Sequence, residues 1–149
     1  MPTIYIDADA CPVKDETYRV ARRYAVSVVV VANAPLRMPA GPLVELVVRP
    51  GFGAADDYIA EVVVAGDIVI TADVPLAARA TAKGAVAIDP KGRVTTDVSA
   101  GAALAVRDLM HDLRQSGVAT GGPAPMTPKD RSRFLGKLDE LVNAARRGR

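Results

Sequence analysis

The chain has no tryptophan, one cysteine and one histidine among its 149 residues, and aromatic residues make up only 4% of it. The single cysteine, Cys11, excludes a disulfide framework and a zinc site built from thiolates. The single histidine, His111, excludes any site that needs two imidazoles. The few aromatic side chains argue against recognition of nucleic acids by base stacking, which needs exposed Phe, Tyr or Trp.

Long apolar stretches are also missing. No run approaches the roughly 18 apolar residues that cross a membrane. The opening residues, MPTIYIDADACPVK, have neither the basic start nor the uninterrupted apolar stretch of a signal peptide. We therefore expect a cytoplasmic protein without a membrane partner. Half of the residues are hydrophobic, which is enough for a core, and the length fits one compact domain.

Charge is spread unevenly along the chain. The net charge is +2, but residues 129–149 carry +4 and the preceding 128 residues carry −2. An acidic body with a basic C-terminal end suits a polyanionic partner. The alternative is a basic helix face that simply lies in solvent.

Short β-branched segments alternate with segments of helical periodicity. We expect strands at 3–7, 26–32, 43–48, 67–71 and 85–88, with helices at 12–25, 55–65 and 74–83. Pro12 fits the first turn of the first helix, where a missing N–H costs nothing. Alternating strands and helices predict an α/β fold with a parallel sheet covered by helices on both faces.

The C-terminal third follows a different pattern. An apolar stripe between Ala102 and Leu113 predicts a helix of about sixteen residues, and residues 115–128 form a Gly/Pro-rich loop. Thr127 is a suitable N-cap, Pro128 a suitable first residue and Asp130 a suitable first-turn acid for a last helix. We therefore expect one domain over residues 1–149, divided into an α/β core (1–114), a loop (115–128) and a basic C-terminal helix (129–149).

Five aspartates follow strands or open helices. Asp7 and Asp9 follow the first strand, Asp73 follows the strand at 67–71, and Asp56 and Asp57 open the helix after the third strand. The carboxyl ends of parallel strands meet at one edge, so we expect these carboxylates to gather there. Oxygen ligands favour Mg²⁺ or Mn²⁺, and such ions serve phosphoryl chemistry. Capping of turns and helices is the alternative role for each aspartate.

Three segments resemble known families. ADDYIAE and ITAD, within residues 55–77, are similar to motifs of the PIN-like nuclease superfamily. Together with IDADACPVK (6–14) and GPAPMTPKDRSRFLGKLD (122–139), they resemble the YaiI/YqxD family over essentially the whole chain. The resemblance implies a PIN-like three-layer α/β/α sandwich with two C-terminal helices. It also implies a divalent-metal-dependent nuclease acting on RNA or on single-stranded or flap-like DNA.

The resemblance also implies roles for the acids. Asp7, Asp57 and Asp73 would bind the metal, with Asp9 and Asp56 as further ligands or outer partners; the catalytic set would be Asp7, Asp9, Asp57 and Asp73. PIN nucleases usually offer one more acid after the strand-end Asp. Here Val74, Pro75 and Leu76 occupy that stretch. The number of metal ions in the site, one or two, therefore stays open.

Two alternatives remain. IDADAC resembles the opening of haloacid-dehalogenase-type phosphatases, in which Asp7 would be the nucleophile and Asp9 a general acid. The second strand here ends in Ala32-Asn33 without the Ser/Thr of those enzymes, and no lysine stands shortly before the acid pair of GDIVITAD. A non-catalytic nucleic-acid-binding module is the other alternative.

Several further residues are candidates for substrate binding. Lys14 lies one turn beyond Asp9, and Asn33 follows the second strand. In the basic C-terminal segment the candidates for phosphate contacts are Lys129, Arg131 and Arg133. Gly51-Phe52-Gly53 lacks the residues of a phosphate loop, so we predict a turn at the mouth of the site.

Overall fold

The computed structural model describes residues 2–39, 41–95 and 126–147. Its strands are β1 (Thr3–Asp7), β2 (Ser27–Ala32), β3 (Val44–Val48), β4 (Ile68–Ile70), β5 (Val86–Ile88) and β6 (Val94–Thr95). Its helices are a 3₁₀ turn η1 (Ala8–Ala10), α1 (Lys14–Tyr24), α2 (Ala54–Val62), α3 (Val74–Ala82) and α5 (Pro128–Arg146). The helix expected around 102–113 lies outside the described residues.

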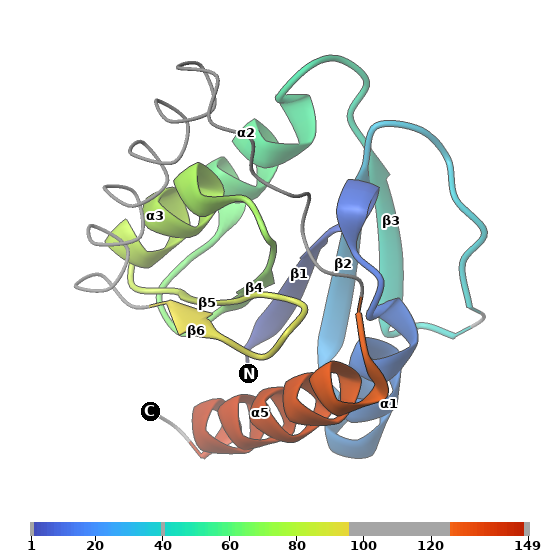
Figure 1. The fold of residues 1–149 in the computed structure, drawn as a ribbon. Coiled ribbons are helices and arrows are strands. Elements are labelled where there is room, and N and C mark those ends of the chain that lie inside the picture. Colours follow the sequence, from blue (N-terminus) through green and yellow to red (C-terminus); the bar gives the residue numbers. More distant parts are fainter. Residues whose placement is uncertain (1, 40, 96–125, 148–149) are drawn as a thin grey trace, which may run out of the picture.

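The strands form one six-stranded sheet in the order β3-β2-β1-β4-β5-β6. All neighbours are parallel except β5 and β6, which are antiparallel. Helices α1 and α5 cover one face of the sheet, and α2 and α3 cover the other (Figure 1). The expected α/β sandwich is confirmed.

Strand residues alternate between the two faces. Ile4 and Ile6 of β1 pack with α1 and α5, whereas Tyr5 packs against the cluster under α2 and α3. Because helices cover both faces of the sheet, the middle of β1 (Ile4–Ile6) and nearly all of β2 are apolar.

The last helix begins as the sequence predicts. The Thr127 hydroxyl accepts a hydrogen bond from the Asp130 N–H, and the Asp130 carboxylate accepts one from the Thr127 N–H, each 3.1 Å long. This capping box sets the start of α5 at the carboxyl edge of the sheet. Phe134, Leu138 and Val142 of α5 are then buried in the core.

Two expected element bounds were wrong, and one strand was not expected. Pro12 lies in a turn before α1, which begins at Lys14, because the chain first forms the η1 turn. Helix α2 ends at Val62 instead of continuing to Gly66, and Val63 is already extended. Strand β6 was not expected because its pairing involves only two residues, too few for a recognisable pattern.

Candidate functional site: an acidic pocket at the carboxyl edge

A pocket of about 270 Å³ opens at the carboxyl edge of the sheet. It lies where the strand order reverses, because β1 continues to β2 on one side while its other neighbour is β4. Parallel α/β proteins bind ligands at this switch point. The lining residues are Asp7, Asp9, Cys11, Asn33, Phe52, Gly53, Ala55, Asp56, Ile70, Thr71, Ala72, Asp73 and Pro90.

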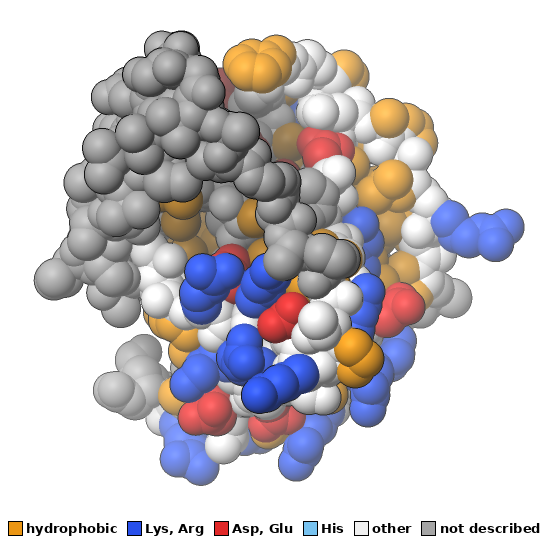
Figure 2. Space-filling view, viewed as in Figure 1, with side chains coloured by type: hydrophobic (Ala, Val, Ile, Leu, Met, Phe, Trp, Pro, Cys, Tyr) orange, Lys and Arg blue, Asp and Glu red, His pale blue; other side chains and the backbone are white. Residues whose placement is uncertain are grey.

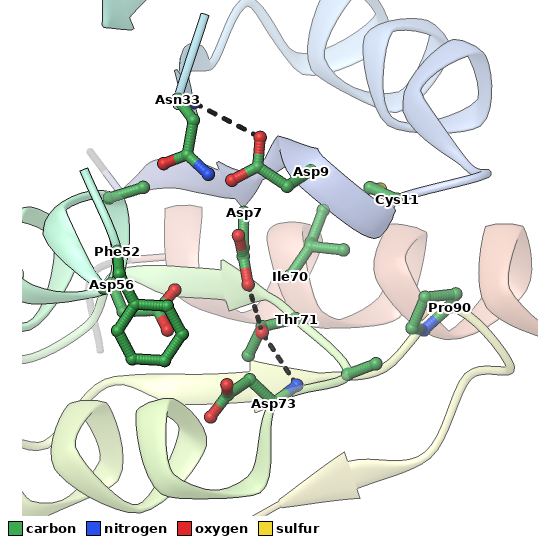
Figure 3. Close-up of a pocket in the computed structure, with 13 residues that line it drawn as sticks. Asp7, Asp9, Cys11, Asn33, Phe52, Asp56, Ile70, Thr71, Asp73 and Pro90 are labelled. Atoms are coloured by element: carbon green, nitrogen blue, oxygen red, sulfur yellow. Dashed lines mark hydrogen bonds between the residues drawn. The ribbon is translucent and has the colours of Figure 1, made fainter. Parts of the chain in front are cut away.

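Four of the five expected carboxylates line this pocket (Figure 3). Asp7 ends β1, Asp9 lies in η1, Asp56 lies in the first turn of α2 and Asp73 is the N-cap of α3. The sheet and three separate helix starts therefore bring together acids that are far apart in the sequence. Among the residues that the structure describes, no lysine or arginine lines the pocket.

Asp57 lies elsewhere. Its carboxylate is exposed and accepts a hydrogen bond of 2.9 Å from Arg79 on α3. Successive residues on a helix point about 100° apart, so Asp56 and Asp57 cannot both face the pocket. The structure places Asp56 in the position that the resemblance implies for Asp57.

Three of the acids use one oxygen for local structure. Asp7 accepts from the Thr71 hydroxyl at 2.9 Å, Asp9 from the Asn33 N–H at 3.2 Å and Asp73 from the Leu76 N–H at 2.9 Å. The second oxygen of each has no hydrogen-bond partner in the part of the chain that the structure describes. Capping and ligand binding are thus compatible at these residues.

Burial and mutual repulsion perturb two of the carboxyls. Burial raises the pKa of Asp56 to about 6, and the nearby charges of Asp7, Asp73, Asp57 and Asp9 add to this rise. Burial also raises the pKa of Asp7, opposed by the hydrogen bond from Thr71 and assisted by the charges of Asp9 and Asp73. The pocket therefore favours the arrival of positive charge, either a proton or a cation.

As the side chains lie, no three carboxylate, imidazole or thiol groups of residues 2–39, 41–95 and 126–147 are close enough together to hold one metal ion. The donor chemistry nevertheless fits a hard cation, since the oxygen donors are four carboxylates, the Thr71 hydroxyl and the Asn33 amide, and the one thiol, that of Cys11, is buried in the wall. Binding would require rotation of carboxylates such as that of Asp56, for which no hydrogen bond holds the side chain within the described chain.

Of the other expected site residues, some line the pocket and others do not. Asn33 lines the pocket. Lys14 does not, because its ammonium donates to the Cys11 carbonyl at 2.9 Å. Cys11 is a packed side chain at the pocket wall, and burial raises the pKa of its thiol.

Arg131 makes two contacts within the fold. Its guanidinium donates to the Pro12 carbonyl at 2.7 Å and forms a 3.4 Å ion pair with Glu16, which fixes the start of α5 beside the start of α1. Lys129 is exposed, and Arg133 forms a 3.4 Å ion pair with Asp130 at the surface.

Thr71 is a site residue that the sequence reasoning did not select. Its buried hydroxyl accepts from the Asp73 N–H at 2.9 Å and donates to Asp7, linking two of the acids. The T-x-D spacing at the strand end was the available signal. Phe52 and Pro90 also line the pocket without having been selected as site residues, although the turn at 51–53 was expected there.

The fold and the pocket define a three-layer α/β protein with an acidic site at the sheet's switch point. The chain belongs to the YaiI/YqxD family: residues 5–144 match the family described as "Uncharacterized BCR, YaiI/YqxD family". It is 57% identical to UPF0178 protein RC1_2062 of Rhodospirillum centenum over all of both chains. It is 53% identical to UPF0178 protein amb2838 of Paramagnetospirillum magneticum, over 99% of this chain and 98% of that one.

A further relative is a UPF0178 protein of Nitrobacter winogradskyi, 55% identical over 97% of this chain and 92% of that one. No solved structure matches the chain. In the parts of the chain that the structure describes, no helix has the length and apolar character needed to span a membrane.

Proposed function

We propose that this protein is a Mg²⁺- or Mn²⁺-dependent phosphodiesterase that cleaves RNA or single-stranded or flap-like DNA. The observation that supports it most is the convergence of Asp7, Asp9, Asp56 and Asp73 on one pocket, where no lysine or arginine of residues 2–39, 41–95 and 126–147 is among the lining residues. Partly buried carboxylates whose pKa values are raised by burial and by one another's charge are typical of functional sites. The implied PIN-like superfamily supports the same chemistry by resemblance.

The metal would be held by Asp7, Asp56 and Asp73, with Asp9 as a further ligand or outer partner. A bound Mg²⁺ supplies a water of lowered pKa and stabilises charge on the phosphate oxygens. Thr71 orients the Asp7 carboxylate through its hydroxyl, and the Leu76 N–H fixes one oxygen of Asp73. These hydrogen bonds hold two of the carboxylates in place before the ligand arrives.

A basic surface beside the pocket supports a nucleic-acid substrate. Pro90 lines the pocket, and the following turn carries Lys91 and Arg93. This turn touches α5, since a Cβ added at Gly92 would lie 3.0 Å from the Arg133 backbone. Figure 2 shows Lys and Arg side chains gathered over this region and along α5. We call Lys91, Arg93, Lys129 and Arg133 the basic ridge.

Two acids lie beside the basic ridge, and they form ion pairs with Arg93 (3.1 Å) and Arg133 (3.4 Å). The Asp89 side chain is 26% exposed and accepts from the Lys91 and Arg93 N–H groups, and the Asp130 side chain is 15% exposed and caps α5. The Arg93 and Arg133 side chains are 72% and 49% exposed. The four cations of the basic ridge outnumber these two acids, which gives this surface the net positive charge that contacts with a phosphate backbone require.

The test is an assay of the purified full chain on RNA, single-stranded DNA, flap DNA and bis(p-nitrophenyl) phosphate, with Mg²⁺, Mn²⁺ or EDTA. We expect metal-dependent cleavage of a nucleic acid that is lost in the Asp73→Asn variant. Cleavage that persists in EDTA, or in Asp73→Asn, would contradict the proposal. Hydrolysis of phosphomonoesters alone, with beryllofluoride trapped on Asp7, would favour the phosphatase alternative instead.

A further inference from the structure

The two phenylalanines of this chain have opposite environments. Phe134 is completely buried under α5, whereas Phe52 is fully exposed, with a relative exposure of 108%. The other exposed large apolar side chains in the described part of the chain are Val64 (60%) and Leu36 (39%), and neither lines the acidic pocket. All four tyrosines are buried or half-buried. Among the described phenylalanines and tyrosines, Phe52 is therefore the one whose ring is fully exposed to solvent.

The backbone holds this ring outward. Gly51 and Gly53 have φ angles of +111° and +73°, which side chains other than glycine rarely adopt. The turn is closed by a hydrogen bond from the Ala54 N–H to the Gly51 carbonyl (3.3 Å), and Gly53 is joined to α2 by the bond from the Asp57 N–H to its carbonyl (2.9 Å). A hydrogen-bonded turn with a glycine on each side displays Phe52 at a defined place.

That place is the rim of the acidic pocket. Phe52 and Asp56 line the same cavity, and Asn33 lines it as well (Figure 3). Carboxylates repel the phosphates of a substrate until a cation neutralises them, so binding gains from a contact that does not depend on charge. An aromatic face provides one, because every nucleobase has a π-face on which it can stack.

We propose that Phe52 is a stacking platform for the nucleobase adjacent to the phosphodiester bound in the acidic pocket. The inference rests on the proposed function and makes it more specific: the substrate has an unpaired base next to the reacting phosphate. Phe52 touches the substrate without taking part in bond cleavage, so it sets affinity and register. The small number of aromatic residues argued against stacking, but one exposed ring at the right position is sufficient.

Tryptophan fluorescence can report this contact. Because it contains no tryptophan, the Phe52→Trp variant carries a single indole at the pocket rim. We expect short single-stranded RNA, added with Ca²⁺ in place of Mg²⁺, to quench its fluorescence in a saturable manner. Inorganic polyphosphate, a polyanion without bases, should leave it unquenched. Val64→Trp, an exposed control outside the pocket, should be quenched by neither.

Binding and turnover provide the second measurement. We expect Phe52→Leu to bind RNA about 5- to 100-fold more weakly and Phe52→Tyr to restore the affinity, since stacking needs an aromatic face and not merely apolar area. The affinity of Phe52→Leu for polyphosphate should stay unchanged. Thermal unfolding of each variant establishes that the exposed substitution leaves the fold intact.

The outcomes separate the two proposals. If Phe52→Leu binds and cleaves RNA like the unaltered chain, or if polyphosphate quenches the indole of Phe52→Trp as RNA does, the stacking platform is wrong and the nuclease proposal stands. If the unaltered chain cleaves no phosphodiester with any metal while RNA still quenches this indole selectively, the base contact stands and the hydrolytic activity is wrong. If RNA neither binds nor quenches, the platform is overturned.

Discussion

The Thr71 hydroxyl donates a 2.9 Å hydrogen bond to the Asp7 carboxylate and so ties the end of β4 to the end of β1. The same oxygen accepts from the Asp73 N–H at 2.9 Å. One buried side chain thus fixes the relative position of two acids that are 66 positions apart in the sequence. Thr71 is the residue through which the sheet sets the geometry of the pocket.

Replacing Thr71 by valine should therefore weaken both the fold and the site. Thr71→Val removes the donor to Asp7 and leaves the Asp73 N–H without its partner, so we expect the free energy of unfolding to fall by about 1–3 kcal/mol. Thr71→Ser keeps the hydroxyl and should retain most of this stability. Urea denaturation of the three proteins measures the difference, and equal midpoints for all of them would contradict the role given to the hydroxyl.

The neighbouring acids Asp56 and Asp57 offer a matched pair of substitutions. Both changes to asparagine remove one negative charge from the first turn of α2, but only Asp56 lines the pocket. We expect Asp56→Asn to slow metal-dependent cleavage by about 100-fold or more, since loss of an outer partner alone commonly costs 10- to 100-fold. Asp57→Asn, which loses the ion pair with Arg79, should remain close to full activity. The measurement is the cleavage rate of the two variants at the same metal concentration. A slower Asp57→Asn variant would show that Asp57, and not Asp56, belongs to the site.

Stability should depend on pH in a way that a divalent cation reverses. The pKa of Asp56 rises from its ordinary 3.8 to about 6 in the folded protein, so the folded state holds more protons between these values. The free energy of unfolding therefore falls as pH rises through about 4 to 6 and remains lower above that range. The raised pKa of Asp7 acts in the same direction.

We expect Mg²⁺ or Mn²⁺ to raise the Tm at about pH 7.5, where the carboxylates are charged, and to have little effect at about pH 4.5, where Asp56 is protonated. Differential scanning calorimetry at the two pH values provides the measurement. The Asp56→Asn variant should show a flatter pH profile between about 4 and 6. A metal-induced shift that is equal at both pH values would show that the cation binds elsewhere.

The arginines at the start of α5 should separate structure from binding. Arg131→Ala removes the hydrogen bond to Pro12 and the ion pair with Glu16, so we expect a loss of about 1 kcal/mol in the free energy of unfolding. Its effect on the salt dependence of RNA binding should be small.

Arg133→Ala should do the reverse. Its guanidinium lies at the surface, and loss of one phosphate contact reduces the salt slope of single-strand binding by about 0.7. Fluorescence anisotropy over a series of salt concentrations, together with urea denaturation, measures both properties. An unchanged slope for Arg133→Ala would remove this residue from the basic ridge.

Two glycines should respond to alanine in opposite directions. Gly92 has a φ of +87° and lies against the Arg133 backbone, so Gly92→Ala introduces both backbone strain and overlap, and we expect a cost of about 1–2 kcal/mol. Gly136 lies within α5 with open space around its added Cβ, so Gly136→Ala should stabilise the protein by about 0.5–1 kcal/mol. Thermal denaturation of both variants tests the pair. A Gly92→Ala variant as stable as the unaltered chain would contradict the close packing of its turn against α5.

The core strands and the cap of α5 were predictable because their signals are local. Continuous β-branched runs such as Ser27–Ala32 identify strands covered on both faces, and Thr127, Pro128 and Asp130 together specify a helix start. The edge at which the aspartates gather followed from the parallel topology alone. These features need no knowledge of side-chain packing.

The choice between Asp56 and Asp57 could not be made in this way. It depends on the rotation of α2 about its axis, which is set by how Ala55 and Ile59 pack against the sheet. The structural role of Arg131 depends on a contact with Pro12, 119 positions away. The exposure of Phe52 likewise depends on where its turn lies in the fold. The amino-acid composition gives only the number of aromatic residues and not their positions.

The turn of Gly51 to Gly53 leads directly into α2, whose first turn carries Asp56. A base stacked on Phe52 would therefore contact the turn that also positions the Asp56 carboxylate in the cavity. The same turn would then position both the aromatic ring that binds the base and the carboxylate that binds the metal. Lengthening or shortening this turn by a single residue would displace Phe52 and Asp56 together.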